Sequence, residues 1–334
     1  MNKFKDKSIL ITGGTGSFGK NFISYLLKNK FPFSRIIVFS RDEFKQDQLQ
    51  KELDFKKNNN LRFFLGDVRD KDRLLYAFKD LDFVVHAAAL KQVPAAEYNP
   101  IEFIKTNVLG AQNIIEASLH NNVKKVLALS TDKAVAPINL YGATKLCSDK
   151  LFISANNIAG KNVTRFSVVR YGNVLGSRGS VLPEFLKFKS NGHTFNITNI
   201  NMTRFNILME EAINLVMLAI NNGIGGEIFI PKLKSFKVTD LAKALDDHCK
   251  FNIIGIRPGE KLHEELITKA ESYNCYDFDK YFLILQENFQ KEYNKKIINK
   301  KIKLPYSYNS EENIFLTIKE IKYILSKFLV NLQK

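Results

Sequence analysis

The sequence predicts an α/β fold: a Rossmann doubly wound parallel sheet with a smaller C-terminal substrate-binding lobe. In the first 170 residues or so, short apolar or β-branched runs alternate with longer amphipathic runs, a pattern typical of βαβ units. A glycine-rich turn directly follows the first apolar run and opens the first amphipathic one. After about residue 175 the pattern becomes irregular. We therefore expect a Rossmann domain over residues 1–175 and mainly a second lobe over 176–334, with some exchange of strands and helices.

The expected strands carry few charges because helices should cover both faces of the sheet. They lie at Ser8–Thr12, Arg35–Ser40, Leu61–Leu65, Phe83–Ala87, Lys125–Ser130 and Thr164–Arg170. The expected helices between them lie at Phe18–Asn29, Glu43–Phe55, Lys71–Phe78, Ile101–Asn121 and Tyr141–Asn157. The second lobe should contain helices at Leu182–Lys189, Glu210–Ile220 and Val238–Leu245 and a strand at Glu227–Ile230. The Lys/Asn-rich stretch at 291–303 is interpreted as a solvated surface segment.

Composition sets the broad class of the protein. The chain has 334 residues, of which 45% are hydrophobic and 25% charged, which is ordinary globular composition and excludes a disordered or coiled-coil chain. No apolar run approaches the roughly 18 to 20 residues that span a bilayer, so we expect no membrane segment. Three unclustered cysteines argue against a disulfide framework or zinc site and favour the cytoplasm. The five histidines do not cluster either, so we predict no metal site.

The net charge of +16 is compatible with an anionic ligand or a nucleic acid. The lysines, however, stand beside asparagines in surface-like tracts, without the interleaved aromatic residues of a single-strand binding platform. We therefore predict no nucleic-acid partner.

A phosphate-binding turn is predicted at Thr12-Gly13-Gly14-Thr15-Gly16-Ser17-Phe18-Gly19. Gly13 allows the tight turn, Gly16 lets the backbone approach a pyrophosphate, and Gly19 lets the helix pack on the strand. The helix N-terminus offers free amides and a positive dipole to the phosphates. Because strand, turn and helix occur in the required order, the motif predicts dinucleotide binding.

The end of the second strand should choose between NAD and NADP. NAD enzymes usually place a carboxylate there for the ribose diol, whereas NADP enzymes place a cation for the 2′-phosphate. Ser40, Arg41 and Lys45 favour NADP, although Asp42 leaves NAD open.

Two further strand ends should complete the cofactor site. Asp67 and Val68 end the third strand, where the adenine ring would lie. Ala87, Ala88 and Ala89 end the fourth, where small side chains admit the nicotinamide half, although such a run alone is more often plain packing.

A catalytic group is predicted at the fifth strand and the helix after it. Tyr141 and Lys145 are four residues apart and share a helix face, so the ammonium can lower the phenol pKa and hold the nicotinamide ribose. Tyr141 would then take a proton from a substrate hydroxyl, to which Thr131 would also hydrogen-bond. From spacing alone, Asp132 and Lys133 are equally well explained as a solvated turn pair.

With these motifs assembled, the chain resembles the extended short-chain dehydrogenase/reductase family and, within it, the inverting UDP-N-acetylglucosamine 4,6-dehydratases. The resemblance runs from about residue 7 to 270 and fades in the last sixty residues. It rests on the glycine turn and on Asp67-Val68-Arg69-Asp70, His86-Ala87-Ala88-Ala89-Leu90-Lys91, Ser130-Thr131-Asp132-Lys133-Ala134, Asn139-Leu140-Tyr141-Gly142-Ala143-Thr144-Lys145, Arg170-Tyr171-Gly172-Asn173-Val174 and Arg257-Pro258-Gly259-Glu260-Lys261-Leu262-His263-Glu264.

The resemblance implies a dehydration without net oxidation. Retaining hexose dehydratases carry an Asp-Glu pair after the fifth strand, whereas this chain has Asp132-Lys133, as the inverting group does. Tyr141 would deprotonate the carbon-4 hydroxyl while NADP⁺ takes the hydride, Lys133 would remove the carbon-5 proton, and Asp132 would protonate the departing carbon-6 hydroxyl. The hydride would return to carbon 6. As a neutral base, Lys133 needs a lowered pKa, which burial beside the nicotinamide charge would supply.

The resemblance also implies a set of binding residues and partners. Thr106 and Lys91 would contact the cofactor, and Ala87 and Lys91 the sugar. Further substrate contacts would come from Asn173, Val174, Arg178, Val181, Thr198, Met202, Arg204, Arg257 and Glu260. The guanidinium groups suit a pyrophosphate, and the carboxylate suits ribose hydroxyls. The family implies a homo-oligomer, such as a hexamer, and a first step towards pseudaminic acid for flagellin glycosylation.

Three alternatives stay open. The chain resembles a UDP-sugar 4-epimerase less well, because an epimerase needs no acid and base for water loss. A dehydratase feeding capsular N-acetylfucosamine would differ in its neighbouring genes. A catalytically dead NADP-binding regulator is opposed by the intact Thr131, Tyr141 and Lys145.

Overall fold

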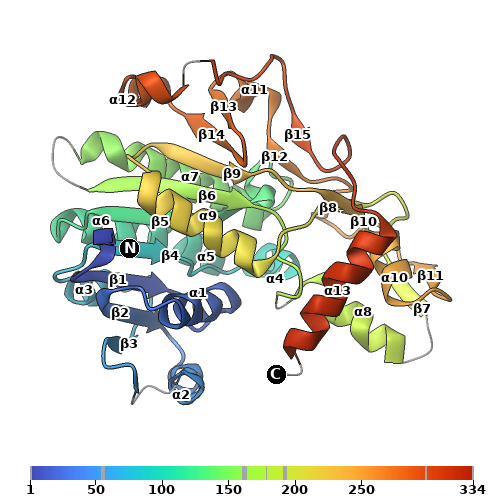
Figure 1. Cartoon of the computed structure of the whole chain (residues 1–334), viewed down its shortest axis with the longest axis horizontal. Coiled ribbons are helices and arrows are strands. Elements are labelled where there is room, and N and C mark those ends of the chain that lie inside the picture. Colours follow the sequence, from blue (N-terminus) through green and yellow to red (C-terminus); the bar gives the residue numbers. More distant parts are fainter. Residues whose placement is uncertain are drawn as a thin grey trace.

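A nine-stranded sheet forms the centre of the computed structural model, which describes residues 2–53, 57–159, 164–177, 179–190, 194–297 and 299–332 (Figure 1). Its order is β13-β14-β9-β6-β5-β4-β1-β2-β3, which contains the 3-2-1-4-5-6 arrangement of a Rossmann fold. The predicted fold class is confirmed. The strands are β1 (Lys7–Thr12), β2 (Phe33–Ser40), β3 (Leu61–Leu65), β4 (Phe83–His86), β5 (Lys125–Thr131), β6 (Arg165–Tyr171), β9 (Glu227–Pro231), β13 (Cys275–Phe278) and β14 (Tyr281–Leu285).

The first six strands match the expected ones, with ends shifted by at most two residues. Every pairing from β3 to β9 is parallel, so the carboxyl ends of these strands meet at one edge. The strands β14 and β13 then add antiparallel to β9. Three strands from beyond residue 175 thus complete the central sheet, and the expectation that the strand at 227–230 lies in the second lobe is wrong. The two-domain division itself stays a prediction.

Helices cover both faces of the sheet (Figure 1). On one face, α1 (Ser17–Lys28) and α9 (Met209–Asn222) share a core that includes Phe22 and Val216. On the other, α3 (Lys71–Ala77), α6 (Gly110–His120) and α7 (Leu140–Ile158) contribute Leu74, Ile114 and Phe152. The helix expected at 210–220 therefore packs on the sheet and not in the second lobe. Burial on both faces explains why the strands are continuously apolar.

The helix expected at Ile101–Asn121 is interrupted. It consists of α5 (Pro100–Phe103), a π-helical segment η3 (Ile104–Leu109) and then α6. Within η3, the Asn107 amide accepts a hydrogen bond from the Leu90 amide and donates to the Leu90 carbonyl and the Thr144 hydroxyl, at 2.9 to 3.0 Å. The irregular turn thereby ties the loop after β4 to α7. Single π-turns of this kind often lie at functional sites.

The smaller lobe has its own core, formed by residues such as Leu182, Phe195, Leu241 and Leu325. Its helices are α8 (Val181–Ser190), α10 (Val238–Leu245) and α13 (Ile318–Leu332). The strands beside this core form two-stranded sheets, which are β7 (Thr194–Ile197) with β11 (Lys250–Ile253) and β8 (Thr203–Phe205) with β10 (Ser235–Lys237). A further pair, β12 (Glu265–Ile267) with β15 (Tyr308–Asn309), packs Leu266, Ile267 and Tyr308 into the core of the central sheet.

The stretch at 291–303 is not simply a solvated segment. It begins inside α12 (Glu287–Ile297), where buried Tyr293 donates a hydrogen bond to the buried Glu227 carboxylate. That contact fixes α12 to the turn before β9. The remaining elements are η1 (Asn2–Phe4), α2 (Glu43–Glu52), α4 (Val93–Tyr98), η4 (Asp132–Ala134) and α11 (Lys269–Ser272). The expected end of the second helix at Phe55 lies outside the described residues. Across those described, no helix has the length and apolar character to cross a bilayer.

Candidate active site

The glycine turn joins the ends of β1 and β4. Gly13 has a φ of 64°, and a Cβ atom there would lie 2.9 Å from the Ala88 backbone. A Cβ at Gly19 would lie 2.6 Å from the Gly14 Cα, so α1 packs directly against the turn. Gly13 requires glycine for backbone conformation and for space, and Gly19 requires it for space. The turn therefore sits at the switch point of the sheet, where α/β folds bind dinucleotides.

The N-terminus of α1 is open. Gly16 is its N-cap and provides no side-chain hydrogen bond, whereas Asp42, Asp70 and Asn139 cap α2, α3 and α7. The free amides of the first turn, which contains Ser17 and Phe18 and follows Thr15, can take phosphate oxygens.

A buried hydroxyl lies in the π-turn of η3. Thr106 is 3% exposed, and its Oγ1 has no hydrogen-bond partner among the described residues. Buried polar atoms are normally paired, so this atom fits a site that a cofactor completes. Ala87 and Ala88 are partly buried at the end of β4, while Ala89 and Lys91 are exposed beyond them.

The residues expected to contact the adenosine end of the cofactor lie at the end of β2 and the start of α2. Asp42 caps α2 by accepting from the Lys45 amide at 3.0 Å, and the Lys45 ammonium binds the same carboxylate. Hydrogen bonds from Lys45 therefore lower the pKa of Asp42. Ser40 is buried and accepts from the Gln46 amide. Asp42 and Lys45 thus form an ion pair with each other. The half-exposed Arg41 guanidinium lies 3.6 Å from the Asp67 carboxylate. Val68, next to Asp67, is buried.

The predicted catalytic residues come together where β5 ends. Thr131 caps η4 and donates to the Asp132 carboxylate at 2.9 Å, and Asp132 accepts from the Lys133 ammonium at 3.0 Å. Tyr141, in the first turn of α7, is near enough for Thr131 and Lys133 to act on its pKa. The group thus forms at the carboxyl edge of the sheet, as the motif spacing indicates.

The link from Lys145 to Tyr141 differs from the expectation. Burial raises the pKa of Tyr141 to about 12, and the groups that oppose this rise are Lys133 and Thr131. The Lys145 ammonium instead donates to the Leu129 carbonyl at 2.7 Å. Burial lowers the pKa of Lys145, with Asp149 opposing the shift. In this structure Lys133, and not Lys145, is the cation that favours the phenolate.

The expected lowering of the Lys133 pKa is wrong for the protein alone. Burial does favour the neutral amine, but the carboxylates of Asp132 and Glu264 outweigh it and raise the Lys133 pKa. For Asp132, burial has a larger effect on the pKa than the neighbouring charge. Burial raises its pKa above the usual range despite Lys133, which suits a carboxylic acid that donates a proton. One oxygen of Asp132, Oδ2, is buried without a hydrogen-bond partner among the described residues.

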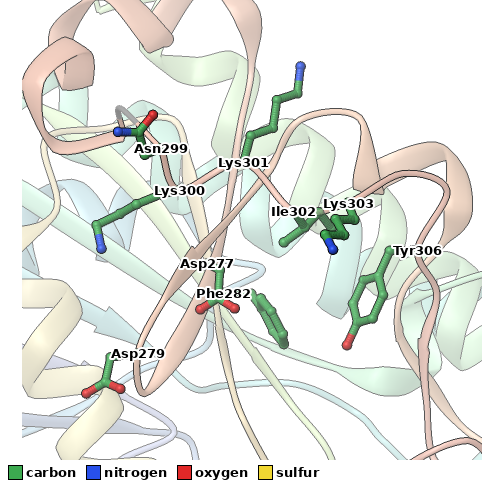
Figure 2. Close-up of a pocket in the computed structure, with 9 residues that line it drawn as sticks. All are labelled: Asp277, Asp279, Phe282, Asn299, Lys300, Lys301, Ile302, Lys303 and Tyr306. Atoms are coloured by element: carbon green, nitrogen blue, oxygen red, sulfur yellow. The ribbon is translucent and has the colours of Figure 1, made fainter.

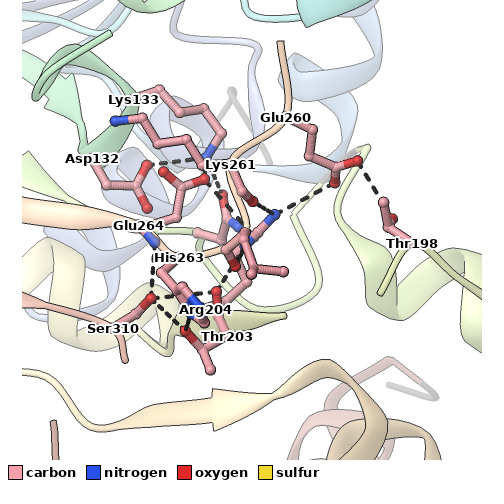
Figure 3. Close-up of polar contacts among 12 residues, drawn as sticks. Asp132, Lys133, Thr198, Thr203, Arg204, Glu260, Lys261, His263, Glu264 and Ser310 are labelled. Carbon is pink, nitrogen blue, oxygen red and sulfur yellow. Dashed lines mark hydrogen bonds and ion pairs between the residues drawn. The ribbon is translucent and has the colours of Figure 1, made fainter. Parts of the chain in front are cut away.

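The predicted nucleotide-sugar contacts gather around Arg204 (Figure 3). Its guanidinium lies 3.4 Å from Glu260 and 3.8 Å from Glu264, and it donates to the Lys261 and Leu262 carbonyls. Thr198 donates to Glu260 at 3.4 Å. A buried, charged and multiply bonded arginine of this kind is suited to a phosphate.

The other expected substrate residues have varied surroundings. Asn173 accepts from Lys133 at 3.1 Å and belongs to the catalytic group. Val174 pairs with Ile207, and Val181 begins α8. Met202 packs in the core of the smaller lobe, and Arg257 is exposed. Arg178 lies outside the described residues.

Sequence reasoning assigned no role to two residues that shape this site. Glu264 lies 3.2 Å from Lys133, and no local pattern connects positions so far apart in the chain. Asn139 accepts from the Gly142 amide as the N-cap of α7. An asparagine just before an amphipathic run is a helix-start signal, so this role was detectable.

A cavity lies away from the catalytic residues and from Arg204. It has a volume of about 670 Å³ and opens between the β13–β14 hairpin and residues 299–306 (Figure 2). Its lining mixes lysines and aspartates and contains none of the predicted site residues. Among the described residues, no group of His, Cys, Asp or Glu side chains is arranged to hold a metal ion.

The fold and site define an extended short-chain dehydrogenase/reductase, with its glycine turn, its Rossmann strand order and Tyr141 and Lys145 on the helix after β5. A family model described as "Polysaccharide biosynthesis protein" matches residues 9–286. The chain belongs to this polysaccharide biosynthesis family.

Several curated relatives are similar over most of the chain. Two Campylobacter jejuni proteins named UDP-N-acetylglucosamine 4,6-dehydratase (inverting) are 51% and 56% identical, over 97% and 84% of this chain and 98% and 83% of theirs. A Rickettsia bellii UDP-glucose 4-epimerase is 41% identical, over 96% of each chain. The family model and the first alignment extend past residue 270, whereas the second alignment covers 84% of this chain, so the expected fading beyond residue 270 holds for one of these relatives and not for the other.

Solved structures have the same fold. The X-ray structure of Pen from Bacillus thuringiensis is 36% identical with a TM-score of 0.88, over 97% of this chain and 99% of that one. A dTDP-glucose 4,6-dehydratase from Streptomyces venezuelae, solved with NAD, has a TM-score of 0.68 at 21% identity, over 76% and 86% of the two chains.

Proposed function

We propose that this protein is a UDP-N-acetylglucosamine 4,6-dehydratase, a hydro-lyase that inverts carbon 5 and gives UDP-2-acetamido-2,6-dideoxy-β-L-arabino-hex-4-ulose. The observation that carries this proposal is Asp132, a buried carboxyl with a raised pKa and one unpartnered oxygen, held beside Lys133. Elimination of water needs an acid and a base on neighbouring carbons, and this pair provides both. The names of the two Campylobacter relatives support the substrate.

Each catalytic side chain has one task in this proposal. Tyr141 takes the proton from the carbon-4 hydroxyl, aided by Thr131 and by the positive charge of Lys133. Lys133 first gives up its own proton to solvent and, as a neutral amine, removes the carbon-5 proton. Asp132 gives its proton to the carbon-6 hydroxyl as it leaves. The cofactor, held by the glycine turn and by Tyr141 and Lys145, would supply the hydride chemistry for oxidation at carbon 4 and reduction at carbon 6, while a solvent proton enters carbon 5 on the opposite face. Lys145, which donates to the Leu129 carbonyl, would hold the nicotinamide ribose.

NADP is proposed over NAD because Asp42 is already engaged as the α2 cap and by Lys45. A carboxylate so engaged is poorly placed for a ribose diol, while the exposed Arg41 guanidinium suits a 2′-phosphate. The residues that would hold the cofactor are Gly13, Thr15, Gly16, Ser17, Phe18, Gly19, Ser40, Arg41, Asp67, Val68, Ala87, Ala88, Ala89, Lys91, Thr106, Tyr141 and Lys145, with Asp42 and Lys45 beside them at the start of α2, bound to each other.

The nucleotide sugar is proposed to lie between the lobes. Arg204 would bind the diphosphate by exchanging its carbonyl partners for phosphate oxygens, and Glu260 and Thr198 would take ribose hydroxyls. The full set of proposed contacts is Ala87, Lys91, Asn173, Val174, Arg178, Val181, Thr198, Met202, Arg204, Arg257 and Glu260.

The test is product analysis with isotopes. Incubation with UDP-N-acetylglucosamine should give a product lighter by one water in the mass spectrum. Substrate deuterated at carbon 4 should place the label in the new carbon-6 methyl group, and heavy water should supply one deuteron at an inverted carbon 5. Release of the carbon-4 label to solvent would contradict the hydride path.

The 4-epimerase alternative is favoured by the 41% identical relative with that name. It predicts a product of unchanged mass, so the same spectrum decides between them. Absence of any turnover would support the catalytically dead regulator.

We also propose that the product enters pseudaminic acid synthesis for flagellin glycosylation. The alternative is a capsule pathway, and the genes next to this one would distinguish the two pathways. The free cysteines support a cytoplasmic location. A homo-oligomer, such as a hexamer, is proposed from the family resemblance, and light scattering would measure its mass.

A further inference from the structure

We propose that Glu264 is a positioning residue for the Lys133 base: it is the buried counter-ion that orients the amine and sets the pH range in which Lys133 removes a proton. This inference rests on the proposed function, because it assigns a role within the same elimination step.

Three acceptors from three parts of the chain surround the Lys133 ammonium. They are the carboxylate of Asp132 at 3.0 Å, the amide oxygen of Asn173 at 3.1 Å and the carboxylate of Glu264 at 3.2 Å. Asp132 precedes Lys133 in η4, Asn173 follows β6, and Glu264 precedes β12. An ammonium has three N–H groups, so these contacts fix the direction of the amine.

Glu264 is itself held firmly. Its amide donates to the Ser310 hydroxyl at 2.9 Å, and the Ser310 amide donates to the Glu264 carbonyl at 2.7 Å (Figure 3). Its side chain is 2% exposed, and Oε2 has no hydrogen-bond partner among the described residues. Leaving a buried carboxylate oxygen unpaired costs stability, which a purely structural role does not explain.

Two carboxylates, Asp132 and then Glu264, raise the pKa of Lys133 against burial. Asp132, Tyr141 and Arg204 face Lys133 from η4, α7 and β8. Arg204 and Lys261 face Glu264, and together with Lys133 they lower its pKa although burial acts to raise it. Burial raises the pKa of Asp132, whereas that of Glu264 is lowered, so Glu264 is the more easily ionised of the two carboxylates. Removing its charge should make Lys133 easier to deprotonate.

The test is the pH profile of water loss in Glu264→Gln. Glutamine keeps a hydrogen-bond acceptor for Lys133 but removes the negative charge. Because the base works only when neutral, the rate rises with pH through the Lys133 pKa, and the variant's rising limb should move to lower pH by about one unit or more. A limb that does not move overturns the inference.

Two further variants sharpen the test. Glu265→Gln is the matched control, because the neighbouring Glu265 accepts from Ser307 and should leave the profile unchanged. Glu264→Asp keeps the charge but shortens the side chain. It should leave the limb in place and lower the maximal rate about tenfold or more, since the amine is misdirected. An undiminished maximal rate in Glu264→Asp also overturns the inference, even if Glu264→Gln does not fold. Absence of water loss in the unmodified protein contradicts the proposed dehydratase instead.

Discussion

Asn139 donates a hydrogen bond from its side-chain amide to the Gly259 carbonyl at 2.7 Å and thereby joins the start of the catalytic helix to the smaller lobe. The same side chain caps α7 through the Gly142 amide. Gly259 has a φ of 74°, and a Cβ there would lie 2.9 Å from the Asn139 Cβ, so the close approach requires glycine. Nearby, Lys261 donates to the Val135 carbonyl at 2.6 Å. The segment that carries Glu260 and Glu264 is thus fixed against the elements that carry Lys133 and Tyr141.

Asn139→Ala should therefore affect both stability and turnover. Loss of a helix N-cap costs about 0.5 to 2 kcal/mol, which thermal unfolding would measure. Asn139→Asp is the control, because it keeps the cap but loses the donor to Gly259. If the contact between the lobes matters for catalysis, the aspartate variant should retain most of the stability and still lose kcat. Equal kcat in Asn139→Asp and the unmodified protein would contradict this role.

Hydride transfer and elimination should separate in two variants. Tyr141→Phe should block the initial oxidation, because the carbon-4 hydroxyl loses its base. Lys133→Ala should still allow reduction of the bound cofactor, seen by its absorbance, yet slow water loss by about 10²- to 10⁴-fold, the usual effect of a general base. Undiminished water loss in Lys133→Ala would show that Lys133 is not the base and is only a residue of the turn after β5.

Cofactor choice should depend on Arg41. Arg41→Asp replaces a cation with a like charge opposite the 2′-phosphate, so the Kd for NADP should rise more than that for NAD. Calorimetric titration with both cofactors would measure it. Asp42→Asn is the matched control, since Asp42 caps α2 and should not change the NADP preference. Equal losses for both cofactors in Arg41→Asp would refute the assignment.

Asp132 should cost stability in its ionised form. Burial raises its folded-state pKa above the unfolded value, so the folded protein binds this proton more tightly. The contribution to stability is therefore present at low pH and is lost as pH rises through the folded pKa. Asp132→Asn has no such loss, so its thermal midpoint should rise relative to that of the parent as the pH increases above about 4, the usual pKa of an unfolded aspartate, while water loss is abolished. A constant difference in midpoint across this range would show that Asp132 does not titrate there.

The sequence by itself determined the βαβ order, the glycine turn and the positions of Thr131, Asp132 and Lys133 after β5 and of Tyr141 and Lys145 on α7. These features depend on local patterns of apolar, glycine and polar residues. In a parallel sheet the carboxyl ends of the strands meet at one edge, so residues that follow different strands come close together regardless of loop conformation.

Only the tertiary structure decided which charges face each other and which strands complete the sheet. Glu264 reaches Lys133, and β14 pairs with β9, through contacts between distant segments that no local periodicity encodes. For the same reason the sequence did not show that Asp132 and Glu264 raise the pKa of Lys133 in the protein alone. A pKa depends on burial and on neighbouring charges, and both are set by how the segments pack.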